Sequence, residues 1–567
     1  MPIKISHLTT KQGQTIKCGR LTILVGPNNS GKSQTLKDIR SHLTTGRTDV
    51  LKIFNDIACE LPSPTDALID TTRSSHPSPE HHNISGISVD LSNREMYAAH
   101  TPSFNAYLEK DDTPNRYKFM LENLGRFWIA HLDAERRFKL SEPTASYEEG
   151  REAPGNALQK FFALPSSQQE QLRDAFKSAF KMDIALDWTA MAKWYMKIGD
   201  GFGALTDDRI QRRDALQSGE DLHEQGDGFR SFAGVALSLL AFPNRLLLLD
   251  EPEAFLHPAQ AYALGTWIAR QASQREPQTI IATHNSNFLW GIVSASPETT
   301  IIRLNRTARG TRYDVVPPAA TQGLVKSPML SSQPILDAMF RRCAVLCEGD
   351  PDRAIYQTVA EKISEVHSSG EVLFVHTNGK GGMSGPLAHL RQAGTPVAAI
   401  VDFDVLNQAS ELERLLVAIT GNAMDPALEV ERAFIAGMVE QGGDESLIAH
   451  LASEVQELLA SPPSELRQFR RRLNALADAA SKWDAVKKKG IAFFDSATRP
   501  RVQQFLANLG ALGLFLVPCG ELESWIPSAG TKKGRTWNAR ALQLLHDQQC
   551  PNDLMDFVKR VLEYLRQ

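Results

Sequence analysis

Residues 21–39 read LTILVGPNNSGKSQTLKDI, and this stretch decides the fold of the first half of the chain. The apolar run Leu21–Val25 predicts a buried strand, and the residues after position 32 predict a helix. Between them, the G-x-x-x-x-G-K-S spacing from Gly26 to Ser33 is that of a P-loop, in the strand–turn–helix context that this motif requires. The stretch therefore predicts a phosphate-binding turn in a parallel α/β sheet.

The chemistry of this turn follows from its residue types. Glycines let backbone N–H groups approach phosphate oxygens, and a helix N-terminus favours their negative charge. Lys32 is expected to pair with the terminal phosphates of a nucleotide, and Ser33 is expected to hold Mg²⁺. The residues expected to contact the nucleotide here are Gly26, Asn28, Asn29, Gly31, Lys32 and Ser33.

Two further apolar strands end in polar residues. Leu246–Leu249 suits a strand buried on both faces of a parallel sheet, and it is followed by Asp250 and Glu251. We expect Asp250 to bind Mg²⁺ and Glu251 to polarise an attacking water. A second strand, residues 279–284, ends in His284, which is placed to sense the γ-phosphate of ATP.

Residues 226–241, GDGFRSFAGVALSLLA, lie between these segments. Small and polar residues open an apolar helix, so its N-terminus is expected to face outward. Together with the two strand-end motifs, this order resembles ABC-type ATPases of the SMC kind over roughly residues 1–305. The resemblance implies that ATP is held between two heads, with Gly228 and Ser231 capping the γ-phosphate of the opposite protomer. The segment lacks the LSGGQ sequence of those ATPases, so the capping role is assigned to Gly226, Gly228 and Ser231 together.

Three other segments of this half allow less specific predictions. Residues 60–85 are rich in Pro, Ser and His and predict a loop, with metal binding by their histidines as the less favoured reading. Residues 141–220 have a polar, largely helical pattern without a long heptad run, which predicts a compact helical insert for dimerisation instead of a coiled-coil arm. In Leu132–Phe138, the arginines either lie near the nucleotide or belong to a solvated turn.

An α/β pattern begins again after residue 334. The apolar run Arg342–Cys347 leads into EGDPD, residues 348–352, and VAAIV leads into Asp402 and Asp404. Together with further strands near residues 371–376 and 513–517, this predicts a second parallel sheet with carboxylates at its C-terminal edge.

The acidic residues at that edge have a specific chemistry. In an extended strand, residues i and i+2 share a face, so Asp402 and Asp404 are expected to point the same way. Glu348, at the end of a neighbouring strand, adds a third negative charge. Carboxylates held this close repel one another unless a cation or a shared proton intervenes. The natural counter-ion is a hard, oxygen-seeking Mg²⁺ or Mn²⁺.

The E-G-x-x-D and D-x-D pairing resembles the TOPRIM domain. An ATPase head followed by TOPRIM is similar to the OLD (overcoming lysogenisation defect) family, which includes the nuclease subunit of Gabija antiphage systems. By that resemblance Asp402 and Asp404 bind metal, Glu348 either binds metal or acts as the base, and Asp352 is the additional acid of the nuclease branch. A late acid and a lysine complete the site in that family. The candidates for them are Glu523 (or Glu521) for the acid, and Lys533 (or Lys532) for the lysine that stabilises charge on the phosphate.

We therefore expect an α/β protein with two domains: an ABC-type P-loop head over residues 1–320 and a TOPRIM domain over residues 335–567. The second domain is predicted to have a helical insertion over about residues 407–510. Within it, residues 467–489 carry eight basic and two acidic residues, a net charge of about +6 and enough for several phosphate contacts. This run is either a DNA-binding surface or a solvated helix face.

The composition indicates the class of protein and the compartment in which it is expected. A hydrophobic content of 42% with 23% charged residues is typical of a soluble globular protein, and the formal net charge of −4 restricts any DNA contact to a local patch. The six cysteines show no C-x-x-C pair, which fits reduced thiols and argues against structural zinc. The N-terminus lacks the apolar region of a secretory signal, so we expect a cytoplasmic protein without membrane contact.

The functional expectation is an ATP-regulated, Mg²⁺- or Mn²⁺-dependent DNA endonuclease, nicking or cleaving, that serves antiphage defence. It would act as a homodimer or higher homo-oligomer through its heads and insert. Related proteins are accompanied by helicase-like subunits or retron RNA–DNA, so such a partner is possible here. The alternative is an ATP-switched DNA-binding or repair scaffold with an inactive TOPRIM domain. A topoisomerase is disfavoured because no DNA-gate domain with a nucleophilic tyrosine is visible.

Overall fold

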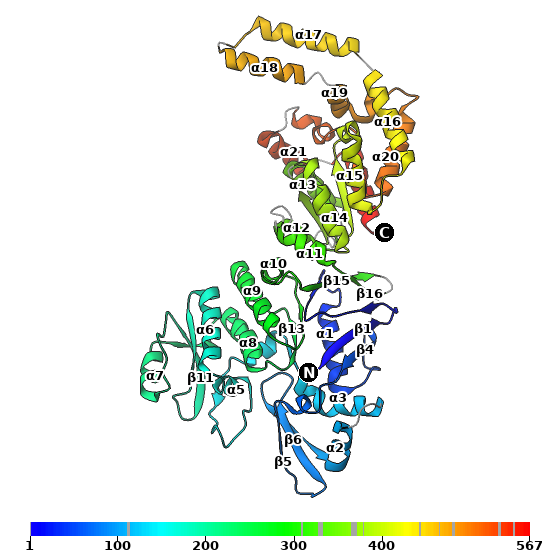
Figure 1. The fold of residues 1–567 in the computed structure, drawn as a ribbon. Coiled ribbons are helices and arrows are strands. Elements are labelled where there is room, and N and C mark those ends of the chain that lie inside the picture. Colours follow the sequence, from blue (N-terminus) through cyan, green and yellow to red (C-terminus); the bar gives the residue numbers. More distant parts are fainter. Residues whose placement is uncertain are drawn as a thin grey trace. The chain divides into compact units, whose positions relative to one another are not determined.

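The computed structural model describes residues 2–109, 114–307, 310–326, 333–363, 371–377, 379–441, 444–463, 465–478, 482–530, 534–547 and 550–566. The chain divides into two compact units, Met1–Phe340 and Arg341–Gln567. Each unit has its own sheet and its own core, and each is described separately below (Figure 1).

A six-stranded sheet with the order β16-β15-β3-β14-β13-β8 forms the centre of the first unit. Five strands are parallel, and β16 alone runs antiparallel to its neighbour. Because parallel strands end at one edge, the residues after β3, β13 and β14 meet there. The strand bounds are β3 Leu21–Val25, β8 Ile129–Leu132, β13 Leu246–Asp250, β14 Thr279–Ala282, β15 Thr300–Thr307 and β16 Gly310–Val315.

Burial explains why these segments are strands. All five residues of β3 and all four leucines of β13 are buried, as expected where helices cover both faces of a sheet. The helices of this unit are α1 Lys32–Thr45, α2 Thr101–Glu109, α3 Pro114–Trp128, α4 Ala134–Lys139, α8 Asp227–Ala241, α9 Pro258–Gln274, α10 Ser286–Ala295, α11 Pro318–Lys326 and α12 Gln333–Ala338.

Two antiparallel sheets of three strands accompany the central sheet. The second of them corrects the prediction of a loop over residues 60–85. Thr71–Ser75 and His81–Ile87 are strands β5 and β6, which pair with each other (Figure 1), and β6 also pairs with β7. The polar composition suggested a loop because β5 is exposed and needs no apolar alternation. The remaining bounds are β1 Lys4–Thr10, β2 Thr15–Ile16, β4 Phe54–Glu60 and β7 Arg94–His100.

The insert over residues 141–220 is not simply helical, which corrects a second prediction. Its helices pack with an antiparallel sheet of short strands. The burial of β11 alternates along the strand, a period of two that helical pattern matching overlooked. The bounds are α5 Ala157–Phe162, α6 Ser166–Phe180, α7 Arg209–Leu216, β9 Thr144–Ala145, β10 Asp183–Asp187, β11 Lys193–Gly199 and β12 Glu220–Asp221.

The second unit is built on a parallel sheet with the order β18-β17-β19-β20. One face packs on α13, α21 and α22, where Val345 and Ile400 join the core. Helices α14 and α15 contact the sheet at β19. The bounds are β17 Cys343–Cys347, β18 Val372–His376, β19 Val397–Val401, β20 Leu514–Leu516, α13 Asp350–Ile363, α14 Ser384–Gln392, α15 Ala409–Thr420, α21 Arg535–Asp547 and α22 Asn552–Arg566.

The described residues of the predicted helical insertion form helices joined by short non-helical segments. Its helices after α15 are α16 Pro426–Gln441, α17 Asp444–Ala460, α18 Leu466–Asp478, α19 Lys482–Lys489 and α20 Arg499–Ala511. Across the described part of the chain, every helix is too short or too polar to cross a lipid bilayer.

Candidate metal centre and nucleotide site

The phosphate-binding turn joins β3 to α1. Gly26 and Gly31 have φ angles of +139° and +106°, conformations that residues with a Cβ rarely adopt. A Cβ at Gly26 would lie 2.2 Å from the carbonyl oxygen of Leu304, so only glycine fits there. Asn28 and Asn29 are exposed at the tip. The turn thus presents accessible backbone directly before the N-terminus of a 14-residue helix.

Lys32 is buried beside this turn. Its ammonium group donates to the carbonyl oxygens of Gly26 at 2.9 Å and Pro27 at 3.0 Å. Burial lowers the pKa of Lys32, and the nearby carboxylate of Glu251 opposes that change. The positive charge is therefore held against the loop, where the sequence predicts the phosphates of a nucleotide.

Ser33 and Asp250 meet at the edge of the central sheet, although 217 positions separate them in the sequence. The Ser33 hydroxyl donates to Asp250 Oδ1 at 3.0 Å. Burial raises the pKa of Asp250. A hydroxyl and a carboxylate side by side are the hard oxygen donors that Mg²⁺ prefers. This pair therefore fits the magnesium ion that accompanies ATP.

Glu251 and His284 form a second contact across two neighbouring strand ends. His284 Nδ1 lies 2.9 Å from Glu251 Oε1. This hydrogen bond raises the pKa of His284 and lowers the pKa of Glu251. The nearby Glu253 is buried and accepts a hydrogen bond from Thr283 at 2.5 Å. The carboxylate expected to polarise water is thus joined directly to the histidine expected to sense phosphate.

Arg137 settles one alternative left open by the sequence. Its guanidinium is fully buried and donates to the backbone carbonyls of Asp250 at 2.7 Å and Glu251 at 2.9 Å. Its Nε also donates to the hydroxyl of Ser231 at 3.0 Å. Arg137 is therefore no part of a solvated turn: it fixes the backbone at the end of β13. Neither motif spacing nor charge pattern identifies this role from the sequence.

The segment expected to cap a second nucleotide begins α8. Gly226 and Asp227 are exposed at the helix start, as predicted. A Cβ at Gly228 would lie 2.9 Å from the carbonyl of Phe255, which gives this glycine a packing role within the chain. Ser231, further along the helix, is fully buried, and its hydroxyl accepts the hydrogen bond from Arg137. Contact between this helix start and the nucleotide of a second head stays a prediction.

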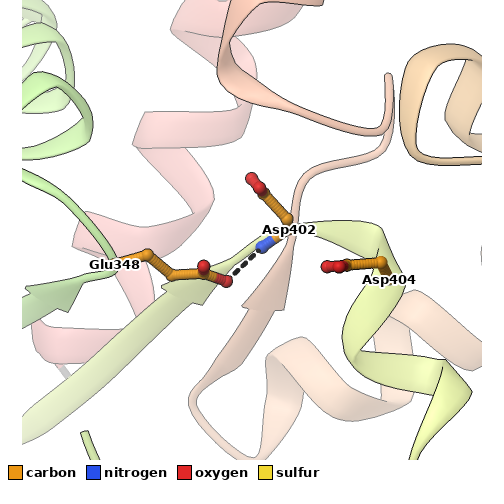
Figure 2. A group of neighbouring side chains, drawn as sticks. All are labelled: Glu348, Asp402 and Asp404. Carbon is orange, nitrogen blue, oxygen red and sulfur yellow. Dashed lines mark hydrogen bonds between the residues drawn. The ribbon is translucent and has the colours of Figure 1, made fainter. Parts of the chain in front are cut away.

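Three carboxylates converge at the C-terminal edge of the second sheet. One oxygen each from Glu348, Asp402 and Asp404 lies within 4.8 Å of the other two (Figure 2). Glu348 follows β17 and Asp402 follows β19, and these strands are parallel neighbours. The backbone N–H of Asp402 donates to Glu348 Oε1 at 2.9 Å. Burial and then the charge of Asp402 raise the pKa of Glu348 to about 7.

The route by which the two aspartates meet differs from the prediction. Strand β19 ends at Val401, and Asp404 lies in the 3-10 turn η4, Phe403–Asn407. Strand alternation therefore does not orient this pair. Phe403 is buried, and its N–H donates to the carbonyl of Gly520 at 2.9 Å, which fixes the turn. A tight turn thus brings both carboxylates to the same site.

The other predicted acids are not members of this group of carboxylates in the described part of the chain. Asp352 is buried in the first turn of α13 and accepts a hydrogen bond from the N–H of Gly349 at 3.1 Å. Glu523 is buried in the 3-10 turn η6, Leu522–Trp525, which Glu521 caps. Lys532 and Lys533 lie outside the described residues. The roles of these five residues stay predictions.

Two lysines that sequence reasoning did not assign contact the carboxylates. Lys487 Nζ, from α19, lies 2.9 Å from Asp402 Oδ2 and 3.7 Å from Asp404 Oδ2. Lys380 Nζ, from the turn after β18, lies 3.0 Å from Asp404 Oδ2. Lys380 could have been found, because it follows a strand that ends at the same sheet edge. Lys487 has no such signal, since only the tertiary fold brings α19 to this site.

The residues present fit a divalent cation. All three converging ligands are carboxylates, the donors that Mg²⁺ and Mn²⁺ prefer. Asp404 Oδ1 is buried, and within the described part of the chain it has no hydrogen-bond partner. A buried acceptor of this kind is destabilising unless a cation or water satisfies it. The arrangement therefore suits an ion bound between β17 and β19.

Comparisons with known protein families match a segment in each half of the chain. Residues 100–289 match a family model described as "AAA domain, putative AbiEii toxin, Type IV TA system". Residues 339–404 match one described as "Overcoming lysogenization defect protein-like, TOPRIM domain", and these residues include Glu348, Asp402 and Asp404. The chain has the ATPase–TOPRIM organisation of the OLD family. The predicted fold class, a P-loop ATPase head followed by TOPRIM, is confirmed.

Solved structures similar to this chain are SMC heads. An SMC head bound to the C-winged helix domain of ScpA is 12% identical, with 55% of this chain and 97% of that one covered and a TM-score of 0.33. The SMC head domain from Thermotoga maritima is 12% identical, with 56% and 100% covered and a TM-score of 0.30. The SMC head of Pyrococcus furiosus is 10% identical, with 57% and 99% covered and a TM-score of 0.30. Scores this low carry no argument about function. No curated protein matches the sequence significantly.

Proposed function

We propose that this chain is an ATP-regulated, divalent-metal-dependent DNA endonuclease that serves antiphage defence. Its ATPase and OLD-like TOPRIM domains support the general class. The observation that carries the proposal is the convergence of Glu348, Asp402 and Asp404 within 4.8 Å. Three carboxylates at one sheet edge are suited to holding Mg²⁺ or Mn²⁺ against a phosphodiester.

In this proposal, the residues of the centre have different roles in phosphodiester hydrolysis. A bound divalent cation would supply Lewis-acid activation of the phosphate and of the attacking water. Glu348, Asp402 and Asp404 hold that cation, and their own backbone contacts position them beforehand. In the proposal, Asp352 and Glu523 add acidic groups, and Lys533 (or Lys532) adds positive charge beside the phosphate.

The head binds ATP in this proposal. Lys32 and the turn from Gly26 hold the phosphates, while Ser33 and Asp250 hold Mg²⁺. Glu251, joined to His284 at 2.9 Å, orients the attacking water. Two heads associate around ATP, with the insert over residues 141–220 contributing to a homodimer or higher homo-oligomer. A helicase-like or retron RNA–DNA partner is a further element of the proposal.

DNA binding is assigned to the basic run of the helical insertion. The arginines of α18 are exposed, as phosphate contacts require. They are Arg467, Arg470, Arg471 and Arg472. Lys487, from the same run, lies at the carboxylate group itself. One continuous segment therefore carries both exposed positive charge and a residue of the proposed catalytic centre.

Plasmid nicking tests the proposal. The native protein should nick supercoiled plasmid in Mg²⁺ or Mn²⁺, EDTA should abolish nicking, and Glu348→Ala should be inactive. Addition of ATP should change the native rate, and Lys32→Ala should remove that change. A native protein that binds plasmid but does not nick it with either metal would support the scaffold alternative. Nicking by Glu348→Ala at the native rate would refute the assigned centre.

A further inference from the structure

Lys487, from the helical insertion, contacts the cluster of carboxylates, and the two lysines that follow it in the sequence do not share its burial. Its ammonium lies 2.9 Å from Asp402 Oδ2, and its side chain is 28% exposed. Lys488 and Lys489, next in the sequence, are exposed to solvent. One lysine of the run KKK is thus committed to the site, while the other two remain at the surface.

The backbone around Lys487 is fixed by close main-chain packing. A Cβ at Gly520 would lie 1.9 Å from the carbonyl oxygen of Lys487, and a Cβ at Gly490 would lie 2.1 Å from that of Pro518. The N–H of Ile491 also donates to the Pro518 carbonyl at 2.8 Å. Such approaches are possible only where glycine leaves out a side chain. Helix α19 is therefore held against the loop that follows β20.

The same loop also fixes the two aspartates. Gly520 contacts Lys487 through its Cα and accepts a hydrogen bond from Phe403 at 2.9 Å through its carbonyl. Phe403 stands between Asp402 and Asp404 in the sequence. One glycine thus links the backbone that carries the lysine to the backbone that carries the acids. Lys487 is positioned as firmly as the carboxylates are.

The charges that surround Lys487 indicate its function. A cation bound by Asp402 takes up the negative charge that now attracts Lys487, and it repels an ammonium group nearby. A phosphodiester at the same site brings new negative oxygens within reach of a lysine side chain.

We propose that Lys487 is a phosphate-binding residue of the nuclease centre, which pairs with Asp402 until metal and DNA arrive. This inference rests on the proposed nuclease function. It makes the helical insertion a direct part of the centre. The proposal does not require any change in the position of Lys380, which contacts Asp404 from a different loop.

Two measurements on Lys487→Met, in the full-length protein, test the inference. The first is Mn²⁺ binding without DNA, followed by electron paramagnetic resonance. Affinity should be unchanged or several-fold tighter, because a competing ammonium is gone. The second is plasmid nicking at saturating Mn²⁺, which should fall about 100- to 1000-fold, the usual effect of losing one charge-stabilising donor. Lys487→Arg should recover part of the rate, and Lys488→Met, at an exposed lysine of the same basic run, should lose much less of it than Lys487→Met does.

Three results would overturn the inference. Nicking by Lys487→Met at the native rate would show that phosphate does not need this lysine. Loss of Mn²⁺ binding together with nicking would show that Lys487 only holds the acids in place. An equal loss in Lys488→Met would indicate general attraction of DNA. If the native protein itself nicks nothing in Mg²⁺ or Mn²⁺, the proposed function fails first, and that result is distinct from all three.

Discussion

The backbone N–H of Asp402 donates to the carboxylate of Glu348 at 2.9 Å, from one parallel strand end to the next. This bond lets a buried acid lie beside another carboxylate before any cation is present. Burial and the charge of Asp402 nevertheless raise the pKa of Glu348 to about 7. The centre is therefore preformed but electrostatically strained, which is the state that a divalent cation relieves.

Replacing Glu348 by glutamine removes the negative charge of this side chain but keeps its size and shape. The amide oxygen can still accept the hydrogen bond from Asp402, so the fold should survive, whereas a metal ligand is lost. Nicking should fall about 1000-fold, since metal activation contributes several kcal/mol, and Mn²⁺ should bind more weakly. Asp350→Asn is the control, because Asp350 is exposed and pairs with Arg353 at 2.8 Å. Native-like nicking by Glu348→Gln would exclude this residue from the chemistry.

Lys32→Ala should weaken ATP binding about 10- to 100-fold, because hydrogen bonds to charged groups contribute about 1.5–3 kcal/mol. The protein should then nick at the same rate with and without ATP. Binding can be followed with a fluorescent ATP analogue. Lys37→Ala, an exposed lysine of the same helix, should behave as the native protein does. Equal ATP affinity in the two variants would refute the role given to Lys32.

Arg137→Met should destabilise the head by about 2–4 kcal/mol. It would leave the buried carbonyls of Asp250 and Glu251 without their donor, and each unsatisfied group costs about 1–3 kcal/mol. ATP hydrolysis should fall more than ATP binding, since the displaced backbone carries the proposed catalytic residues. Thermal unfolding and ATPase rates check this. Arg136→Met, at a partly exposed residue that pairs with Asp133, should unfold almost as the native protein does.

Strand-end chemistry was predictable from the sequence, and the reason is geometric. Parallel strands end at one edge, so an acid after one apolar run must lie near an acid after the next. Glu348 and Asp402 meet on that basis. The argument needs only the positions of the strands and no knowledge of loops or of packing.

Placements that depend on tertiary packing were not predictable. In the sequence, Lys487 is one of eight basic residues in a run. Only the packing of α19 against Gly520 brings it to the carboxylates and distinguishes it from the others. Asp404 was expected on a strand, but β19 ends before it. Arg137 was undecided because its partners are backbone carbonyls, which leave no trace in side-chain patterns.

Gly520→Ala should test how far the centre depends on backbone packing. Gly520 has φ +106°, and a Cβ would lie 1.9 Å from the carbonyl of Lys487, so α19 must shift. Plasmid nicking should fall at least about tenfold, as expected when a 1 Å misplacement disturbs a catalytic geometry. Gly437→Ala, in α16 where space around the position is open, should nick normally. Equal rates for both variants would show that the position of α19 is unimportant.

The buried ion pair of the insert gives a prediction about stability. Asp183 is fully buried and accepts hydrogen bonds from Arg173 at 2.7 and 2.9 Å and from the N–H of Phe202 at 3.0 Å. At pH 7, Asp183→Asn should destabilise the chain by about 3–5 kcal/mol, because it removes the buried counter-charge of Arg173 and leaves only the exposed Glu170 to pair with it. Asp214→Asn should have almost no effect, since Asp214 and its partner Arg213 are exposed.

The effect of Asp183 should also depend on pH with a definite sign. Burial alone would raise its pKa, but the hydrogen bonds from Arg173 and Phe202 outweigh burial and lower the pKa to about 2. In the unfolded chain the pKa is about 3.9. The carboxylate therefore stabilises the fold above about pH 4, and that contribution is lost as the pH falls towards 2. The difference in melting temperature between native protein and Asp183→Asn should shrink between pH 5 and pH 3, each value being measured at about equal ionic strength. A difference that stays constant over this range would mean that the charge of Asp183 is not what stabilises the insert.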